Sequence, residues 1–276
     1  MPLGSWGGAG MSQRGPAKAP PPLRREAAPL RAVIAARANW IAASVTALQQ
    51  RRFVDAAWLV GSLGRGTADP YSDVDLVVAV DTTTPQGVFD DPVAGLRLPG
   101  PVLFTVGKPR NAPAGGGYLT VCVELATLPV LVDLYLWPTE TAALPAEGRL
   151  LLHRTPPPPR TDLAFIPLLD RHRTPDTTGT DPTRPASVLM LVQLAAKYLA
   201  RGDQPRHVAI TRHLDLPSGA DNVMLRQILD ERIEPAAARQ LRSAIAAAHR
   251  LLDLADAVAA THLLRDDPSH DGRSGS

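Results

Sequence analysis

Two short apolar runs joined by a glycine-containing loop constrain the fold of this chain most. Residues 56–60 and 74–80 are predominantly apolar and short, which predicts two buried strands. The first run stops at Gly61, and the loop 64–72 leads into the second run. A glycine-rich turn therefore connects two strands, and a β-sheet must be part of the fold.

Further segments are consistent with such a sheet. Residues 101–106, 118–125 and 130–137 also have strand-like apolar content, and the last two are close enough in sequence to form a hairpin. Between the first strands and these three, residues 82–100 hold Pro, Gly, Thr and Asp, which predicts a long irregular segment.

Helical periodicity flanks the predicted strands. Between residues 23 and 52, apolar side chains recur at steps of three and four, typical of an amphipathic helix or helix pair that packs on the sheet. Residues 189–200 and 236–264 show the same periodicity, with shorter helices expected between them.

These patterns predict an α+β protein in which a mixed β-sheet flanked by helices is followed by a C-terminal helical bundle. A segment rich in Pro, Thr, Asp and Gly separates the two parts and is expected to be a linker or loop. The expected organisation is a disordered tail (1–22), a sheet-containing domain (23–160), a linker (161–185), a helical domain (186–265) and a second disordered tail (266–276).

Charge and cysteine content exclude some functions. Lys and Arg total 29 against 27 for Asp and Glu, so bulk charge does not argue for a stable nucleic-acid partner. The single cysteine, Cys122, lies in an apolar run, where a buried structural thiol is expected rather than a nucleophile. No apolar run approaches the roughly 20 residues that span a bilayer, so a cytoplasmic protein with no membrane partner is expected.

Paired aspartates begin the second strand. Side chains two apart on a strand point to the same side, so Asp73 and Asp75 project together while Val74 and Leu76 turn the other way. Two carboxylates held this close repel each other unless a cation neutralises them. Mg²⁺ prefers oxygen ligands and is often held by one or two carboxylates together with substrate phosphates, so the pair predicts a magnesium site.

The turn before the aspartates suits the phosphates of such a substrate. Gly61 permits close backbone approach, and Ser62 offers a hydroxyl and an amide to phosphate oxygens. Arg65 can neutralise a phosphate without blocking the metal. We therefore predict nucleotide-binding roles for Gly61, Ser62 and Arg65.

The order Gly61-Ser62, then Arg65-Gly66, then Asp73-Val74-Asp75 at the start of an apolar strand resembles the DNA polymerase beta superfamily of nucleotidyltransferases. Its small bacterial branches include aminoglycoside and lincosamide nucleotidyltransferases. The resemblance implies that residues 23–160 are the catalytic domain. It also allows a homodimer, because many small relatives form dimers that share a cleft.

Members of the superfamily have a third carboxylate on a later strand. Asp133 matches best, because its neighbours Val132 and Leu134 would face the core. Glu124, on the preceding strand, is the alternative base or an acceptor-binding residue. Related enzymes also carry a lysine in the first helix of the helical domain that reaches the triphosphate, and Lys197 resembles it; a solvated basic face is the other interpretation of Lys197.

The resemblance implies a two-magnesium mechanism. Asp73 and Asp75 would hold the nucleotide-bound Mg²⁺ and share a second ion with Asp133, while an acceptor hydroxyl attacks the α-phosphate of an NTP, most simply ATP, and expels pyrophosphate. The preferred acceptor is a small molecule such as an aminoglycoside or lincosamide antibiotic. Alternatives are a toxin-like enzyme that modifies tRNA or protein, and a non-catalytic, antitoxin-like nucleotide-binding partner.

Overall fold

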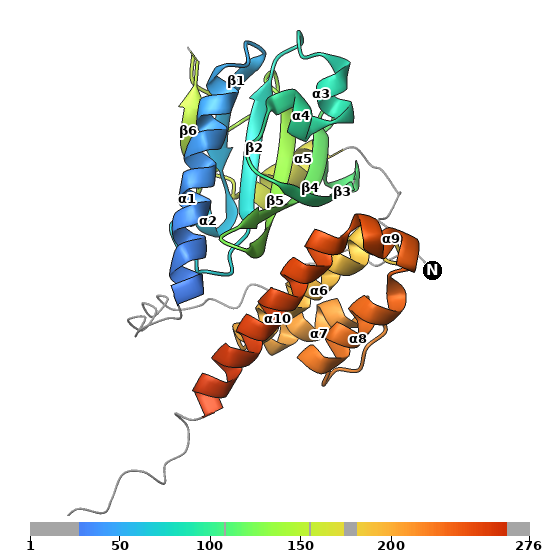
Figure 1. Cartoon of the computed structure of the whole chain (residues 1–276). Helices are drawn as coiled ribbons and strands as arrows, with labels where there is room; N and C mark the ends of the chain where they lie inside the picture. The colour runs from blue at the N-terminus through green and yellow to red at the C-terminus, as the bar shows by residue number, and fades with distance from the viewer. Residues whose placement is uncertain (1–27, 108, 155, 174–180, 264–276) are drawn as a thin grey trace, which may run out of the picture.

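A computed structural model describes residues 28–107, 109–154, 156–173 and 181–263 of the chain. Its centre is a six-stranded sheet in the order β3-β4-β5-β2-β1-β6 (Figure 1). β2 and β5 pair in parallel and all other neighbours pair antiparallel, so the predicted mixed sheet is confirmed. The strands are β1 (Val54–Leu59), β2 (Val74–Val80), β3 (Val102–Gly107), β4 (Gly117–Leu125), β5 (Leu128–Pro138) and β6 (Arg149–His153).

One face of the sheet is covered by the long helix α1 (Ala28–Gln49). Its buried apolar stripe packs against alternate residues of the strands, including Val74, Leu76, Val132 and Leu134. Two short helices, α3 (Gln86–Asp90) and α4 (Pro92–Leu96), add Val88 and Leu96 to the same core. They lie in the segment that the sequence predicted as irregular.

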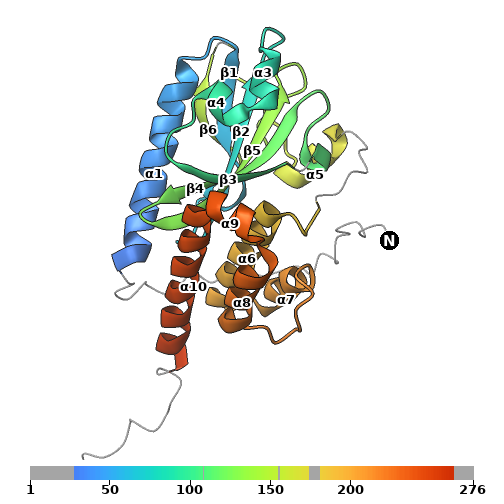
Figure 2. The ribbon, with the colours of Figure 1, turned by 45° about the vertical axis from the view of Figure 1, so that its right-hand side comes forward.

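The other face of the sheet is covered in part by α5 (Phe165–His172), so that α1 and α5 lie on opposite sides of the sheet (Figure 2). Phe165, Leu168 and Leu169 are buried against strand residues such as Tyr135 and Trp137. The sequence placed residues 161–185 in a linker, and α5 corrects that expectation for its own eight residues. Prolines and polar residues on both sides concealed the short apolar spacing of this helix.

The C-terminal part is helical, as predicted, and it too packs on the sheet. It consists of α6 (Pro185–Ala200), α7 (Gln204–Arg212), α8 (Asn222–Arg232), α9 (Pro235–Gln240) and α10 (Arg242–Leu263). Leu189, Val192 and Leu252 share one apolar cluster with Phe104 of β3 and Leu131 of β5. Because this core is continuous with the sheet, the division into two domains stays a prediction, whereas the α+β class is confirmed.

Several features were absent from the sequence-based expectation. The loop after β1 contains a single-turn helix, α2 (Gly61–Arg65), and β6 forms an edge strand beside β1. The predicted tails, 1–22 and 266–276, lie outside the described residues. Within the part of the chain that the structure describes, each helix is too short or too polar to cross a bilayer.

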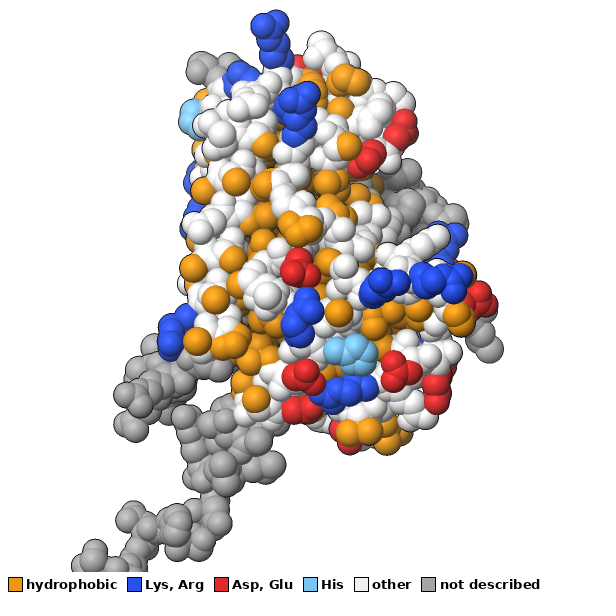
Figure 3. Space-filling view, in the orientation of Figure 1, with side chains coloured by type: hydrophobic (Ala, Val, Ile, Leu, Met, Phe, Trp, Pro, Cys, Tyr) orange, Lys and Arg blue, Asp and Glu red, His pale blue; other side chains and the backbone are white. Residues whose placement is uncertain are grey.

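Positive and negative side chains alternate on the face that carries the helical bundle. Figure 3 shows Lys, Arg, Asp, Glu and His side chains interspersed over its lower half. Within the bundle, Arg226 of α8 contacts Asp253 and Asp256 of α10, at 2.7 and 2.8 Å. The lower half of the face in Figure 3 thus carries side chains of both signs.

Candidate active site

Strand pairing brings the predicted carboxylates together. Asp73 and Asp75 project from the face of the sheet opposite α1, because Val74 and Leu76 fill the core on the α1 side. In the parallel pairing of β2 and β5, the Cα of Asp75 lies directly beside that of Asp133. This register places Asp75 and Asp133 on the same face of the sheet, as predicted, and Asp73 directly precedes the strand.

The carboxylates occupy a polar strip between two apolar clusters on one face of the sheet. Towards one end of the strands, Leu131 and Cys122 pack under the helical bundle. Towards the other end, Val77 and Tyr135 pack under α5. Asp75 and Asp133 lie between these clusters, so α5 and the helical bundle form the two walls of the site.

Asp75 is the most strongly perturbed acid of the strip. Burial raises the pKa of its carboxyl to about 7, and the negative charges of Asp133 and Asp73 add to this effect. Lys197 and Arg65 oppose the rise because their positive charges favour the ionised form. A buried carboxyl that holds its proton near neutrality is a group that a divalent cation would stabilise as the anion.

The Gly61 turn lies against Asp75. Gly61 has φ +61°, and a Cβ built on it would lie well inside van der Waals contact with Oδ2 of Asp75 and 3.0 Å from Cγ. Only glycine fits both conditions. Ser62 is the second residue of α2, where main-chain amides lack acceptors within the helix, and Arg65 at the end of α2 is exposed.

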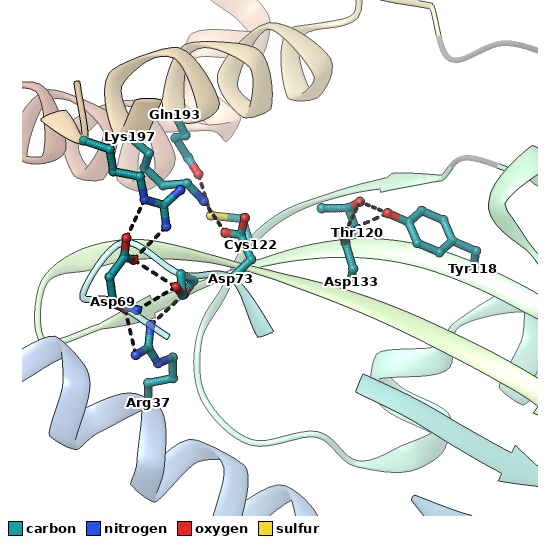
Figure 4. A network of polar contacts seen from close by, with 11 residues as sticks. Arg37, Asp69, Asp73, Tyr118, Thr120, Cys122, Asp133, Gln193 and Lys197 are labelled. Carbon is teal, nitrogen blue, oxygen red and sulfur yellow. Dashed lines mark hydrogen bonds and ion pairs between the residues drawn. The ribbon is translucent and has the colours of Figure 1, made fainter. Parts of the chain in front are cut away.

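Two hydroxyl groups orient Asp133. Tyr118 and Thr120 of β4 both donate to its Oδ1, at 2.6 and 2.8 Å (Figure 4). Thr120 is the Cα partner of Asp133 across the β4–β5 pair. Neither Tyr118 nor Thr120 was predicted as a site residue, although their spacing of two on a strand predicts a shared face.

Lys197 reaches the site from α6. Its ammonium donates to Oδ1 of Asp73, and the lysine is only 4% exposed. This position excludes the interpretation of Lys197 as part of a solvated basic face. One turn earlier on α6, Gln193 accepts a hydrogen bond from the thiol of Cys122 at 3.5 Å, and burial raises the pKa of that thiol to about 12. Cys122 is therefore the buried structural thiol that was predicted.

Glu124 is not brought to the carboxylates. It lies four residues beyond Thr120 on β4, which corresponds to roughly 13 Å along the strand. Its Oε2 pairs with Arg250 at 3.1 Å, and the same arginine donates to the carbonyl of Thr127 at 2.6 Å. This geometry separates Glu124 from Asp133 and leaves Asp133 as the third carboxylate of the strip.

The carboxylates fit a magnesium site that the nucleotide completes. Among the described residues, no three Asp, Glu, His or Cys side chains converge into a closed cation site. Mg²⁺ does not require one, because it is usually bound by one or two carboxylates together with phosphate oxygens and water. Asp73 and Asp75 supply such a pair, and Asp75 lies in close contact with the turn at Gly61.

Comparison with known proteins agrees with this geometry. The family model of the nucleotidyltransferase domain matches residues 41–108, which include Gly61, Ser62, Asp73 and Asp75. Asp133 and Lys197 lie beyond the matched segment and are placed by the structure alone. No curated protein matches the chain significantly. Residues 41–108 are therefore similar in sequence to a nucleotidyltransferase domain.

Proposed function

We propose that this protein transfers a nucleoside monophosphate, AMP from ATP in the simplest case, to a hydroxyl group of a small molecule and releases pyrophosphate. The family match over residues 41–108 supports nucleotidyl transfer in general. The observation that carries the proposal is the strand register that sets Asp75 beside Asp133, with the turn at Gly61 in close contact with Asp75.

Each residue has a separate task in this proposal. Asp73, Asp75 and Asp133 would hold the Mg²⁺ that accompanies the nucleotide. Bound magnesium supplies positive charge to the phosphate oxygens and favours loss of the acceptor's proton. The main chain at Gly61 and Ser62 receives phosphate oxygens, and Lys197 moves from Asp73 to the phosphates.

The transfer is an in-line displacement. The acceptor's hydroxyl oxygen forms a bond to the α-phosphorus, and the bond from that phosphorus to the bridging oxygen of the β-phosphate breaks. Pyrophosphate leaves with the electron pair of the broken bond. Asp133 accepts the hydroxyl proton, and the hydrogen bonds from Tyr118 and Thr120 hold its carboxylate in one orientation meanwhile.

The preferred acceptor class is a small hydroxylated antibiotic such as an aminoglycoside or lincosamide. Two features support a small acceptor. Positive and negative side chains are interspersed on the face that Figure 3 shows, a distribution less suited to the phosphate backbone of tRNA than a basic surface. The site also carries three carboxylates, and the charge that remains around bound magnesium and phosphate favours a cationic acceptor.

The test is a transfer assay with radiolabelled NTPs and three acceptor pools: an antibiotic panel, purified tRNA and proteins of a cell lysate. We expect label on an antibiotic together with stoichiometric pyrophosphate, and loss of both in Asp75→Asn. Label on tRNA or protein would replace the small acceptor with a toxin-like function. Nucleotide binding without pyrophosphate release from any pool would contradict catalysis and indicate a binding partner.

A further inference from the structure

Two ion pairs join the loop before β2 to one face of α6. Asp69 pairs with Arg201 through two hydrogen bonds of 2.7 Å, one to each carboxylate oxygen, and Asp73 pairs with Lys197. The two acids are four residues apart, and so are the two cations. On a helix this spacing places Lys197 and Arg201 one turn apart on the same side. Figure 4 shows Asp69, Asp73 and Lys197 close to one another.

We call Asp69–Arg201 the outer pair and Asp73–Lys197 the inner pair. The loop that carries Asp69 is also hydrogen-bonded to α1. Arg37 is only 4% exposed and donates to the carbonyls of Ser72, at 2.6 Å, and Asp69, at 3.0 Å. The hydroxyl of Ser72 donates to Oδ1 of Asp69 at 2.8 Å and accepts from the Asp69 amide at 2.9 Å. Burying a guanidinium is costly unless such bonds are made, so this turn is built to be rigid.

The outer pair differs from the inner pair in how firmly it is held. The guanidinium of Arg201 lies 6.0 Å from the ring of Tyr71 and 5.8 Å from that of Tyr198. Burial alone would raise the pKa of Asp69, but the hydrogen bonds and charge of Arg201 outweigh it and lower that pKa. Asp69 therefore stays ionised at neutral pH. Planar two-point pairing also restricts orientation more than a single ammonium contact does.

Nucleotide binding would break one of the two ion pairs and leave the other in place. Under the proposed function, Asp73 turns to a cation and Lys197 turns to phosphate, so their mutual contact is lost. Without another tie, α6 would be free to move off the loop. The Asp69–Arg201 pair takes no part in either exchange and remains one turn away.

We infer that Arg201 is a positioning residue: its pair with Asp69, backed by Arg37, holds α6 over the carboxylates while Lys197 moves from Asp73 to the nucleotide. This inference rests on the proposed function. Arg201 acts through Lys197 and touches neither substrate nor metal.

A double-mutant cycle tests this coupling. We measure the Kd of a non-hydrolysable ATP analogue with Mg²⁺ for wild type, Arg201→Met, Lys197→Gln and the double variant. Arg201→Met should weaken binding about tenfold, the size of a lost charge-assisted bond. In the Lys197→Gln background, Arg201→Met should add less than about twofold, because the residue that it positions is gone. Additive losses would overturn the inference.

Arg226 of α8 supplies a matched control. The side chain of Arg226 has a similar exposed fraction, 26% against 22% for Arg201, and it also bonds two carboxylate oxygens, but these belong to Asp253 and Asp256 of α10 and not to the loop before β2. Arg226→Met should lower the melting temperature without changing the Kd. Arg201→Lys keeps the charge but not the two-point geometry, and it should bind with an intermediate Kd even if Arg201→Met folds poorly.

Hydrogen exchange separates this inference from the proposed function. Arg201→Met should accelerate amide exchange in residues 69–75, and Arg226→Met should not. If the wild type bound no nucleotide but this local effect appeared, the proposed function would fail, whereas the claim that Arg201 holds α6 against the loop would be supported. Unchanged amide exchange in Arg201→Met would refute the positioning role of Arg201, whatever the nucleotide data show.

Discussion

Replacing Gly61 by alanine should damage the site more than the fold. The backbone at Gly61 has φ +61°, a conformation that costs an alanine roughly 1–2 kcal/mol. The added Cβ would also overlap Oδ2 of Asp75 and approach its Cγ to 3.0 Å, so the carboxylate must move. A displacement of about 1 Å at a catalytic group costs on the order of a hundredfold in rate. We expect kcat/KM to fall by about that factor.

A second glycine with positive φ, but without a carboxylate beside it, separates the backbone cost from the overlap with Asp75. Gly115 has φ +71°, and a Cβ there would meet only Cγ of Pro138 at an ordinary 3.5 Å. Chemical denaturation should show a loss of stability in both variants, at least as large in Gly61→Ala as in Gly115→Ala because only the former also displaces Asp75. Pyrophosphate release should be lost only in Gly61→Ala. Equal activities in the two variants would refute the claim that the turn at Gly61 sets the position of Asp75.

Three further predictions concern the pH dependence of stability, a turn and the thiol. The pKa of Asp75 is about 7 in the folded state and 3.8 in the unfolded state. Its contribution to the free energy of unfolding is therefore full below pH 4 and is lost as pH rises to 7; that contribution is at most about 4 kcal/mol. The metal-free protein should therefore melt at falling temperatures from pH 5 to 8, Asp75→Asn should remove much of that slope, and a slope unchanged in the variant would contradict the assignment. Ala126 and Thr127 join β4 to β5 with φ +48° and +68°, so Thr127→Gly should stabilise the protein by roughly 1 kcal/mol in urea unfolding; destabilisation would show that the Thr127 side chain compensates for the strain. Cys122, buried with a pKa near 12, should resist iodoacetamide at pH 8 until the protein unfolds, and rapid labelling of the native protein would exclude this burial.

The sheet and its acidic strip were predictable from the sequence because they depend on apolar and acidic residues that alternate along a strand. Apolar residues on both sides of Asp75 and Asp133 fixed which way each carboxylate points, and the sequence indicated this directly. The choice between Asp133 and Glu124 could not be made in that way. It depends on strand register and on Arg250, which lies over a hundred residues further along the chain.

The supports of the site were hidden for a different reason. Arg37 lies on the buried side of α1 among apolar residues, and an isolated arginine in a helical pattern normally indicates a solvated face. Its partners Asp69 and Ser72 stand in a loop without periodicity. Similarly, α5 is short and flanked by proline-rich and polar stretches, so its burial against the sheet depends on tertiary packing alone.

Isothermal titration of the protein with Mg²⁺ and a non-hydrolysable ATP analogue tests the central claim most directly, because it reports on the aspartate pair without an acceptor. Asp81, just beyond the far end of β2, provides the control; its carboxylate accepts hydrogen bonds from the amide and hydroxyl of Thr83 in a surface turn. We predict magnesium-dependent nucleotide binding in wild type and Asp81→Asn, and its loss in Asp73→Asn and Asp75→Asn. Retention of wild-type magnesium dependence in both of the latter variants would contradict the account.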